Sequence, residues 1–300
     1  MFRILELSDA CSRVSVEHRQ IVVWGENGAG GPLHSSPCED LLAVILDGRR
    51  TQITTSTLRA LMRAGPAVMV SDDHHMPIGL MVSMEGYSEA ARRIRLQAAQ
   101  SLPATKRIWR DLVVAKICAQ AANLEPLSAG EVQVRAIAAT VHSGDPENRE
   151  AQAARAYWSV FWDDTTYRRG GDSPDVRNTL LNYGYAILRA VMARSIGAVG
   201  LSAVFGVSHV ARENSFALAD DLMEPVRPFV DRHARDLWLE GATDLGKDER
   251  QALAGLLHED CEVAGARMPL LIGIQRLAQS YAGIVEARRQ TLDIPVFPAE

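Results

Sequence analysis

The first 85 residues alternate short apolar runs with polar turns. Runs of β-branched and apolar character lie at 3–7, 13–16 and 21–24, and a fully apolar run at 41–46 ends at an Asp-Gly pair. Short apolar runs bounded by turn residues are typical of β-strands, and a run without polar alternation indicates a strand buried on both faces. This part of the chain is therefore predicted to be rich in β-structure.

The same region is predicted to hold one helix and several turns. Glycine, serine and proline gather at 26–37, which predicts a loop. Thr55 is placed to cap a helix, because apolar residues follow it at helical spacing. Two further strands, at 67–70 and 78–82, are predicted on either side of the Asp-Asp-His-His turn at 72–75.

After residue 86 the pattern becomes helical. Alanine, leucine and arginine dominate long segments, with glycine and proline mostly between them. The predicted helices are 89–121, 130–141, 149–162, 178–196, 214–224, 247–261 and 270–289. The whole pattern predicts an α+β fold, with a small N-terminal β-rich domain over residues 1–85 and a larger all-α helical domain over residues 86–300.

Composition places the chain among water-soluble globular proteins. Apolar residues make up 47% and charged residues 23% of the sequence, which is ordinary for a folded domain. We see neither a signal peptide nor an uncharged apolar run of the roughly 20 residues that a transmembrane helix needs. The four cysteines are scattered without a C-x-x-C pair, which argues against a thiolate zinc site and favours a cytoplasmic protein with reduced thiols.

Charge is distributed unevenly along the chain. The formal net charge of −5 argues against nucleic-acid binding, because neutralised phosphates supply much of the affinity of such proteins. The segment 92–116, however, carries seven basic residues and one acid. It includes Trp109, so it suits phosphate tracking and base stacking as well as it suits a basic amphipathic helix with a buried tryptophan. The basic residues are Arg92, Arg93, Arg95, Lys106, Arg107, Arg110 and Lys116.

One histidine and two carboxylates are placed to hold a metal ion. If Asn214 caps a helix, Asp221 and Glu224 lie three residues apart on one face of it, and His209 precedes that helix in the loop after Gly206. This set of donors suits Mg²⁺ or Mn²⁺. From spacing alone, an exposed acidic helix face with a surface histidine is the simpler interpretation.

A further acid, Glu150, begins a predicted helix after the turn at 144–148. The helix dipole favours a carboxylate there whether or not it binds metal, so this residue alone does not indicate a ligand. Asp145 or Asn148 is placed to cap the helix. The two acids and two histidines at 72–75 look like a metal cluster, but adjacent residues on a turn point in different directions, and we interpret them as a solvated turn.

Several motifs, in order along the chain, resemble one protein family. The motifs are Met76-Pro-Ile-Gly-Leu80, Arg93-Ile-Arg-Leu-Gln97, Lys116-Ile-Cys-Ala-Gln-Ala121, Asn148-Arg-Glu150, Asn182-Tyr-Gly-Tyr185 and Asp221-Leu-Met-Glu-Pro225. Together they are similar to the CRISPR-associated integrases that form the first core protein of spacer acquisition, in particular to their type II branch. The resemblance extends through most of the chain.

The resemblance implies an activity, a site and partners. It implies a metal-dependent DNA endonuclease and integrase of antiviral defence, which joins the 3′-hydroxyl ends of a spacer to the CRISPR repeat array. Position by position, it implies Glu150, His209 and Glu224 as catalytic ligands of Mg²⁺ or Mn²⁺, with Asp221 as a weaker candidate. It also implies a cytoplasmic homodimer that binds double-stranded DNA through both domains, dimerises through the N-terminal one, and joins a small second core protein ("Cas-two") in a larger complex.

Two other functions stay open from the sequence. One is a catalytically silent DNA-binding scaffold of the adaptation complex, against which the intact ligand candidates argue. The other is a metal-dependent hydrolase of a smaller phosphoester, against which the basic segment 92–116 argues. Loss or survival of DNA joining in a variant of Glu150 or Glu224 would distinguish the catalytic function from the scaffold.

Overall fold

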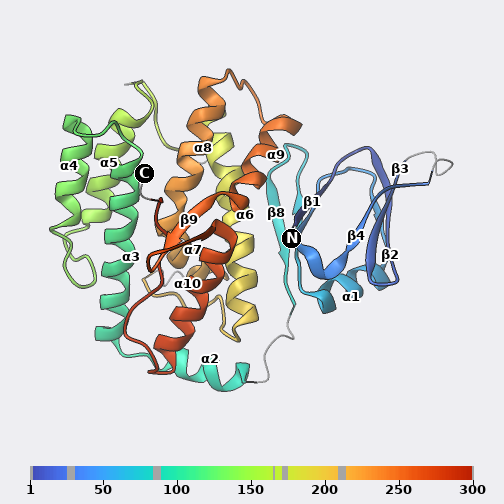
Figure 1. Cartoon of the computed structure of the whole chain (residues 1–300), viewed down its shortest axis with the longest axis horizontal. Helices are drawn as coiled ribbons and strands as arrows, with labels where there is room; N and C mark the ends of the chain where they lie inside the picture. The colour runs from blue at the N-terminus through green and yellow to red at the C-terminus, as the bar shows by residue number, and fades with distance from the viewer. Residues whose placement is uncertain are drawn as a thin grey trace. The chain divides into compact units, whose positions relative to one another are not determined.

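A computed structural model of the chain describes residues 3–25, 31–83, 89–164, 166–170, 175–208 and 214–298 (Figure 1). The chain divides into two compact units, Met1–Tyr87 (unit 1) and Ser88–Glu300 (unit 2), where the sequence predicts a division after residue 85. An N-terminal β-rich region followed by a helical region confirms the predicted α+β fold. Within the described ranges, no helix is long and apolar enough to cross a membrane.

Unit 1 contains two four-stranded sheets and one α-helix. Its elements are β1 Arg3–Leu7, β2 Cys11–Glu17, β3 Gln20–Gly25, β4 Pro32–Pro37, β5 Leu41–Leu46, β6 Gln52–Ile53, α1 Thr55–Ala64, β7 Ala67–Ser71 and β8 Pro77–Met81. The first sheet has the order β1-β5-β7-β8 and the second the order β4-β3-β2-β6. In the first sheet β1, β5 and β7 are parallel, and β8 pairs antiparallel with β7.

One apolar core is shared by the two sheets and α1. Leu7 and Val44 of the first sheet, Val14 and Ile21 of the second sheet, and Leu61 of α1 are all fully buried in it. Burial of a side chain of this size contributes roughly 1.5–3 kcal/mol, so this cluster is the main source of stability in unit 1. The uniformly apolar sequence of β5 follows from its pairing on both edges and its burial on both faces.

Most predicted elements of unit 1 are confirmed, with two corrections. The cap of helix α1 is Thr54, one residue before the predicted cap, because Thr54 accepts the N–H of Thr57 at 3.2 Å, and Gly65, with φ of 94°, follows the last helical residue. The loop predicted as far as residue 37 is wrong in its second half, where β4 pairs antiparallel with β3. Proline is tolerated in β4 because this strand lies at the edge of its sheet.

Unit 2 is helical, with one two-stranded hairpin. Its helices are α2 Ala90–Ala98, α3 Leu102–Ala122, α4 Ala129–Ala138, α5 Arg149–Phe161, α6 Val176–Ala198, α7 Ala217–Met223, α8 Arg227–Leu239, α9 Lys247–Gly255 and α10 Leu270–Val285. The 3₁₀ helices η2 Glu224–Val226 and η3 Leu256–His258 follow α7 and α9, and β9 Asp260–Val263 pairs with β10 Ala266–Pro269.

Helix α6 forms the centre of unit 2. It packs against α7, α8, α9 and α10 (Figure 1), and most of its side chains are buried. At Gly184 of α6, a Cβ atom would lie 2.4 Å from Cγ1 of Val230, so glycine permits α8 to approach closely. Helices α3, α4 and α5 lie side by side, and α3 also packs against η2. The candidate site described below lies where α3, α5 and η2 meet.

The single helix predicted over 89–121 is wrong, because α2 and α3 are separate helices. Ser101 precedes α3 in an extended conformation, and Pro103 occupies its first turn. Proline is accommodated in the first turn of a helix but not in its interior, so the chain breaks there. The segment 99–101 therefore lets α2 take its own direction.

Two elements of unit 2 are absent from the sequence prediction. Helix α8 follows Pro225 and contains Pro228 as its second residue; two prolines so close together indicate a loop in the sequence, although Pro228 fits the first helical turn. The helix predicted over 247–261 ends at Gly255, and η3 and the hairpin β9–β10 replace its last turns. That hairpin turns at Ala264 and Gly265, both with positive φ.

Candidate metal and DNA site

Glu150 is fixed at the start of α5 by the turn that precedes it. The carboxylate of Asp145 accepts the N–H of Arg149 at 2.8 Å and the N–H of Glu150 at 3.0 Å. Asn148, with φ of 53°, accepts the N–H of Ala151 at 3.4 Å. The first N–H groups of a helix have no partner within it, so both predicted caps are used, and Glu150 is held in the first turn.

The ammonium of Lys116 joins two carboxylates from distant parts of the sequence. Its Nζ lies 2.5 Å from Oε1 of Glu150 and 2.5 Å from Oε2 of Glu224. Lys116 lies on α3, Glu150 on α5 and Glu224 at the start of η2. The two carboxylate oxygens are at most about 5 Å apart, because both contact the same nitrogen. The structure thus brings together two of the three ligands that the family resemblance implies.

These three side chains are largely screened from water. The exposed fraction is 11% for Lys116, 5% for Glu224 and 26% for Glu150. Burial lowers the pKa of Lys116, but the charges of Glu224 and Glu150 outweigh burial and raise this pKa above its ordinary value. Lys116 is therefore a charged ammonium held between two carboxylates.

Arg227 adds a second positive charge to the cluster. Its Nε lies 3.2 Å from Oε1 of Glu224, one helical turn away in the sequence. Burial lowers the pKa of Arg227, and the charge of Glu224 offsets this and raises it. Counted as ionised groups, Lys116 and Arg227 balance Glu150 and Glu224, so the cluster has no net charge. Its neutrality explains how four charged groups tolerate this degree of burial.

Asp221 supports the chain segment that leads to His209. Asp221 is fully buried, and its Oδ2 accepts the N–H of Val207 at 2.5 Å and the N–H of Ser208 at 2.9 Å. Two N–H groups at successive residues thereby fix the backbone immediately before the predicted histidine ligand. His209 itself lies outside the described residues, so its place in the site stays a prediction.

The neighbouring acid, Asp220, supports the other end of the same segment. Its Oδ2 accepts the side-chain N–H of Asn214 at 2.8 Å, and its Oδ1 accepts Nε of Arg189 at 2.6 Å. Asn214 is not the helix cap that the sequence predicts, because α7 begins at Ala217. Instead, Oδ1 of Asn214 accepts the N–H of Phe216 in the turn before α7.

A buried acid, Asp231, lies close to the charged cluster. The hydroxyl of Tyr185 donates a hydrogen bond to it, and Tyr157 is hydrogen-bonded to it as well. Burial raises the pKa of Asp231 to about 7, although both tyrosines and the charges of Lys116 and Arg227 act to lower it. Asp231 is therefore a buried group that changes charge near neutral pH.

Helix α2, which carries the first basic residues of the segment 92–116, is fastened at several points. Arg92 and Arg93 contact Oε1 of Glu286, just after α10, at 2.6 and 3.1 Å. A hydrogen bond from Arg93, together with the charge of Arg93, holds the pKa of Glu286 below its ordinary value. Arg93 also donates to the carbonyl of Val199 at 2.6 Å. These two arginines, predicted to contact DNA, thus make internal contacts in unit 2.

Gln97 completes the attachment of α2. Its Nε2 donates to the carbonyls of Ser202 at 2.9 Å and Phe205 at 3.1 Å, and its Oε1 accepts the N–H of Ser202 at 3.0 Å. The side chain is buried. Three hydrogen bonds of one amide fix the segment 202–205, which lies upstream of Val207 and Ser208.

The rest of the basic segment offers both paired and exposed groups. Arg110 contacts Oδ1 of the adjacent Asp111 at 2.6 Å, and Lys116 lies in the cluster. The exposed members are Arg95, Lys106 and Arg107. The carbonyl of Lys106 accepts the N–H of Gly144 at 2.9 Å, so Lys106 lies beside the turn that fixes Glu150. All seven basic residues of this segment stay predicted DNA contacts.

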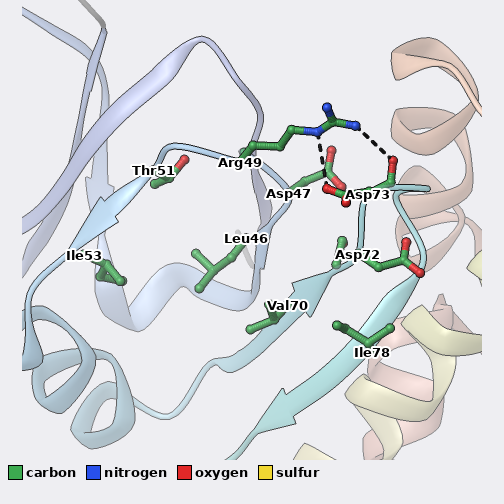
Figure 2. Close-up of a pocket in the computed structure, with 11 residues that line it drawn as sticks. Leu46, Asp47, Arg49, Thr51, Ile53, Val70, Asp72, Asp73 and Ile78 are labelled. Carbon is green, nitrogen blue, oxygen red and sulfur yellow. Dashed lines mark hydrogen bonds and ion pairs between the residues drawn. The ribbon is translucent and has the colours of Figure 1, made fainter.

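A cavity of about 500 Å³ opens in unit 1, outside these groups (Figure 2). It is lined by Leu46, Asp47, Gly48, Arg49, Thr51, Ile53, Val70, Ser71, Asp72, Asp73 and Ile78. Figure 2 shows Arg49 reaching Asp73, whose Oδ1 lies 3.5 Å from Nε. Asp47, on the same lining, contacts Nδ1 of His75 at 2.8 Å. Arg49 and Asp73 thus pair across the lining, whereas Asp47 is engaged by a residue outside it.

The solvated turn predicted at 72–75 is confirmed. Oδ1 of Asp72 accepts the N–H of His74 at 2.8 Å and the N–H of Met76 at 2.9 Å, which closes the loop between β7 and β8. In the part of the chain that the structure describes, no three or more histidine, cysteine, aspartate or glutamate side chains gather as a metal site. Glu150 and Glu224 meet at the buried ammonium of Lys116, whereas the other described carboxylate pairs that share a cation, such as Asp164 and Asp175 at Arg177, meet at a guanidinium.

Sequence reasoning missed the roles of Lys116 and Arg227 in this cluster. Lys116 was assigned to the basic face of its helix, yet it lies between Val113 and Ile117, which are both buried. A lysine at a buried helical position indicates an internal carboxylate partner. Arg227 follows Glu224 by three residues, a spacing that allows an ion pair on a helix, and this signal was available in the sequence.

The chain matches one family model and proteins of known name. The family model described as "CRISPR associated protein Cas1" matches residues 6–262, a range that includes Glu150, His209 and Glu224. A protein of Neisseria meningitidis serogroup C (strain 8013), named "CRISPR-associated endonuclease Cas1", is 31% identical over 288 residues. That match covers 94% of this chain and 92% of the relative.

Solved structures with low sequence identity share the fold. The structure "Casposase bound to integration product" has a TM-score of 0.80 at 19% identity, covering 97% of this chain and 93% of that one. A chain of the "Cas6-RT-Cas1–Cas2 complex" has a TM-score of 0.77 at 18% identity, covering all of this chain and 36% of that one. The likeness extends over both units of this chain.

Proposed function

The chain belongs to the Cas1 family of CRISPR-associated proteins, and on this premise we propose that it is a DNA integrase and endonuclease of spacer acquisition. It joins the 3′-hydroxyl ends of a short duplex to a CRISPR repeat array. The observation that carries the proposal is the meeting of Glu150 and Glu224 at one buried cation, within the range that the family model matches. A relative named as an endonuclease and a structural neighbour bound to an integration product support it.

We propose Mg²⁺ or Mn²⁺ as the cofactor, held by Glu150, His209 and Glu224, with Asp221 as a weaker candidate. The residues fit such an ion: two carboxylates from different helices converge on one positive charge, and both ions prefer carboxylate oxygen. When bound, the ion polarises the target phosphodiester and favours ionisation of the attacking hydroxyl. The hydrogen bonds from Val207 and Ser208 to Asp221 favour the role of Asp221 in placing the histidine over its role as a ligand.

The protein's own groups supply positioning and charge. Asp145 holds the backbone of Glu150, and Arg227 holds the carboxylate of Glu224, so both acids keep their places before substrate arrives. Preorganised charge of this kind contributes most of the benefit in phosphoryl transfer. Of the basic segment, the exposed Arg95, Lys106 and Arg107 are best placed to contact phosphates, because Arg92, Arg93 and Arg110 already hold carboxylates of this chain.

We further propose a cytoplasmic homodimer on double-stranded DNA that works with a small second core protein. The likeness to a chain of a complex that also contains Cas2 supports the second partner. Assignment to the type II branch rests on the motifs of the sequence alone. The N-terminal unit is proposed to serve dimerisation and DNA contact.

Integration of a short duplex into a supercoiled plasmid that carries a CRISPR repeat tests the proposal. The assay contains Mg²⁺ or Mn²⁺ and the small partner protein, and it compares wild type with Glu224→Gln, which keeps the shape of the side chain and removes its charge. We expect joining to fall ~100-fold or more in the variant. Glu125→Gln changes an exposed carboxylate in the same unit and should leave joining unchanged.

Three other results of this integration assay would lead to different conclusions about the site or the function. Joining that survives in Glu224→Gln would reject Glu224 as a ligand while leaving the integrase function in place. Absence of joining by wild type, with DNA bound and the partner present, would favour the silent scaffold. Hydrolysis of nucleotides without any effect on duplex DNA would favour the smaller phosphoester as substrate.

A further inference from the structure

We propose that Lys116 is an internal competitor of the divalent ion, because its ammonium occupies the position between Glu150 and Glu224 and must withdraw when the ion binds. The inference rests on the metal site of the proposed function and concerns how that site is kept before loading. It gives Lys116 a role different from the DNA contact predicted from the sequence.

The distances leave room for one cation at this position. Nζ of Lys116 lies 2.5 Å from one oxygen of each glutamate, and an ammonium donates through three N–H groups. A Mg²⁺ ion lies about 2.0–2.1 Å from its oxygen ligands. An ion bound to both of these oxygens would overlap the volume of Nζ. The carboxylates therefore bind either the ammonium or the ion.

The charges favour exchange over coexistence. With Lys116 and Arg227 in place the cluster is neutral, because Glu150 and Glu224 balance them. A divalent ion added to the neutral cluster would leave two positive charges in excess in a largely buried place. Like charges at close range disfavour one another, so withdrawal of the ammonium lowers the free energy of the loaded site.

The same contacts explain why a lysine stands at this position. Without any cation, two carboxylates would face each other within about 5 Å, with Glu224 almost fully buried. Their repulsion would separate α5 from η2. Lys116 keeps them together, and its flexible four-carbon stem lets the ammonium leave by rotation about its own bonds. Helix α3 need not move for the exchange.

The affinity for Mn²⁺ tests the proposal on the full chain. Mn²⁺ binding, followed by electron paramagnetic resonance of the free ion, is compared between wild type, Lys116→Met and Lys247→Met. Lys116→Met keeps the apolar stem and removes the charge, and we expect its Kd to be at least ~10-fold lower than that of wild type. Lys247 is exposed on α9, so Lys247→Met should bind as wild type does.

Thermal denaturation adds a second readout on the same proteins. In EDTA, Lys116→Met should melt at a lower temperature than Lys247→Met, because Glu150 and Glu224 then lack the cation that lies between them. Saturating Mn²⁺ should raise the melting temperature of Lys116→Met by more than that of wild type. An equal or higher Kd in Lys116→Met would overturn the competition while leaving the metal site intact. Absence of Mn²⁺ binding in all three proteins would reject the metal site and this inference together.

Wild type provides a test that does not depend on the variant's folding. The chain contains three lysines, Lys106, Lys116 and Lys247, so amine acetylation followed by peptide mass spectrometry reports on each one. In EDTA, Lys116 should react slowly and the two exposed lysines quickly. Saturating Mg²⁺ should accelerate acetylation of Lys116 at least ~10-fold and leave the other two rates unchanged. A Lys116 rate that does not respond to Mg²⁺, in protein shown to bind it, would overturn the proposal.

Discussion

Asp231 should make the stability of unit 2 fall as the pH rises toward neutrality. Burial raises its pKa to about 7 in the folded protein, against 3.8 for an unperturbed aspartate. Between these values the folded state holds a proton that the unfolded state has released. Stability therefore declines by about 1.4 kcal/mol for each pH unit well below pH 7, which amounts to roughly 2 kcal/mol between pH 5 and pH 7 and roughly 3 kcal/mol between pH 5 and pH 8. The decline ends about one pH unit above 7, where Asp231 is ionised in both the folded and the unfolded state.

Asp231→Asn removes this titration and keeps the size of the side chain. Melting temperatures of wild type and variant are compared at intervals from pH 5 to pH 8. In a domain of this size 1 kcal/mol corresponds to about 2–4 °C. Wild type should therefore lose roughly 6–12 °C more than the variant over this range, with the smallest difference at pH 5. Other groups titrate in both proteins and cancel in the comparison.

The surroundings of Asp231 define the control and the refutation. Tyr185 and Tyr157 are hydrogen-bonded to it, and Lys116 and Arg227 lower its pKa through their charges. Asp236→Asn changes an exposed acid on the same helix and should follow wild type. Parallel curves for wild type and Asp231→Asn from pH 5 to pH 8 would refute the reasoning, because they would show that burial does not keep Asp231 protonated.

The remaining predictions concern the segment before His209 and the centre of unit 2. Asp221→Ala leaves two backbone N–H groups without their acceptor and should cost about 2–4 kcal/mol in urea denaturation. Asp221→Asn keeps an acceptor oxygen and should cost less than half as much, whereas equal costs would show that these hydrogen bonds contribute little. Gly184→Ala places a Cβ 2.4 Å from Cγ1 of Val230 and should cost about 1–3 kcal/mol. Adding Val230→Ala should recover part of that loss, and a Gly184→Ala variant as stable as wild type would contradict the close packing of α6 on α8.

Local signals in the sequence were sufficient for part of the site. The caps of α5 were predictable because Asp145 and Asn148 act on N–H groups a few residues away. The pairing of Glu150 with Glu224 was expected only from the family resemblance, because 74 residues of chain separate them and no periodicity relates α5 to η2. Their common partner, Lys116, comes from a third helix. Lys116 is buried because α3 packs against both α5 and η2. The sequence of a single segment does not reveal such packing between distant segments.

The misplaced elements have a similar origin. β4 was taken for a loop because proline and serine disfavour strands, yet pairing with β3 at a sheet edge outweighs that preference. Asn214 was expected to cap a helix, but its amide is engaged by Asp220 and the helix begins three residues later. In both cases a tertiary contact overrides a local preference. The apolar periodicity of α1, α5, α6 and α10 was reliable because burial itself produces that pattern.

The contacts that hold α2 against the rest of unit 2 determine how this unit responds to a stretching force. α2 is the first helix of this unit, and Arg93 ties it to Glu286, which directly follows the last helix, α10. Gln97 connects the same helix to the segment 202–205 by hydrogen bonds. A stretching force applied to the chain before α2 therefore acts on α10 and on that segment through these contacts. Only after the contacts break does the force act on α5 and η2. In a single-molecule stretching experiment, the ties of α2 would yield first, and Glu150 and Glu224 would keep their spacing until that rupture.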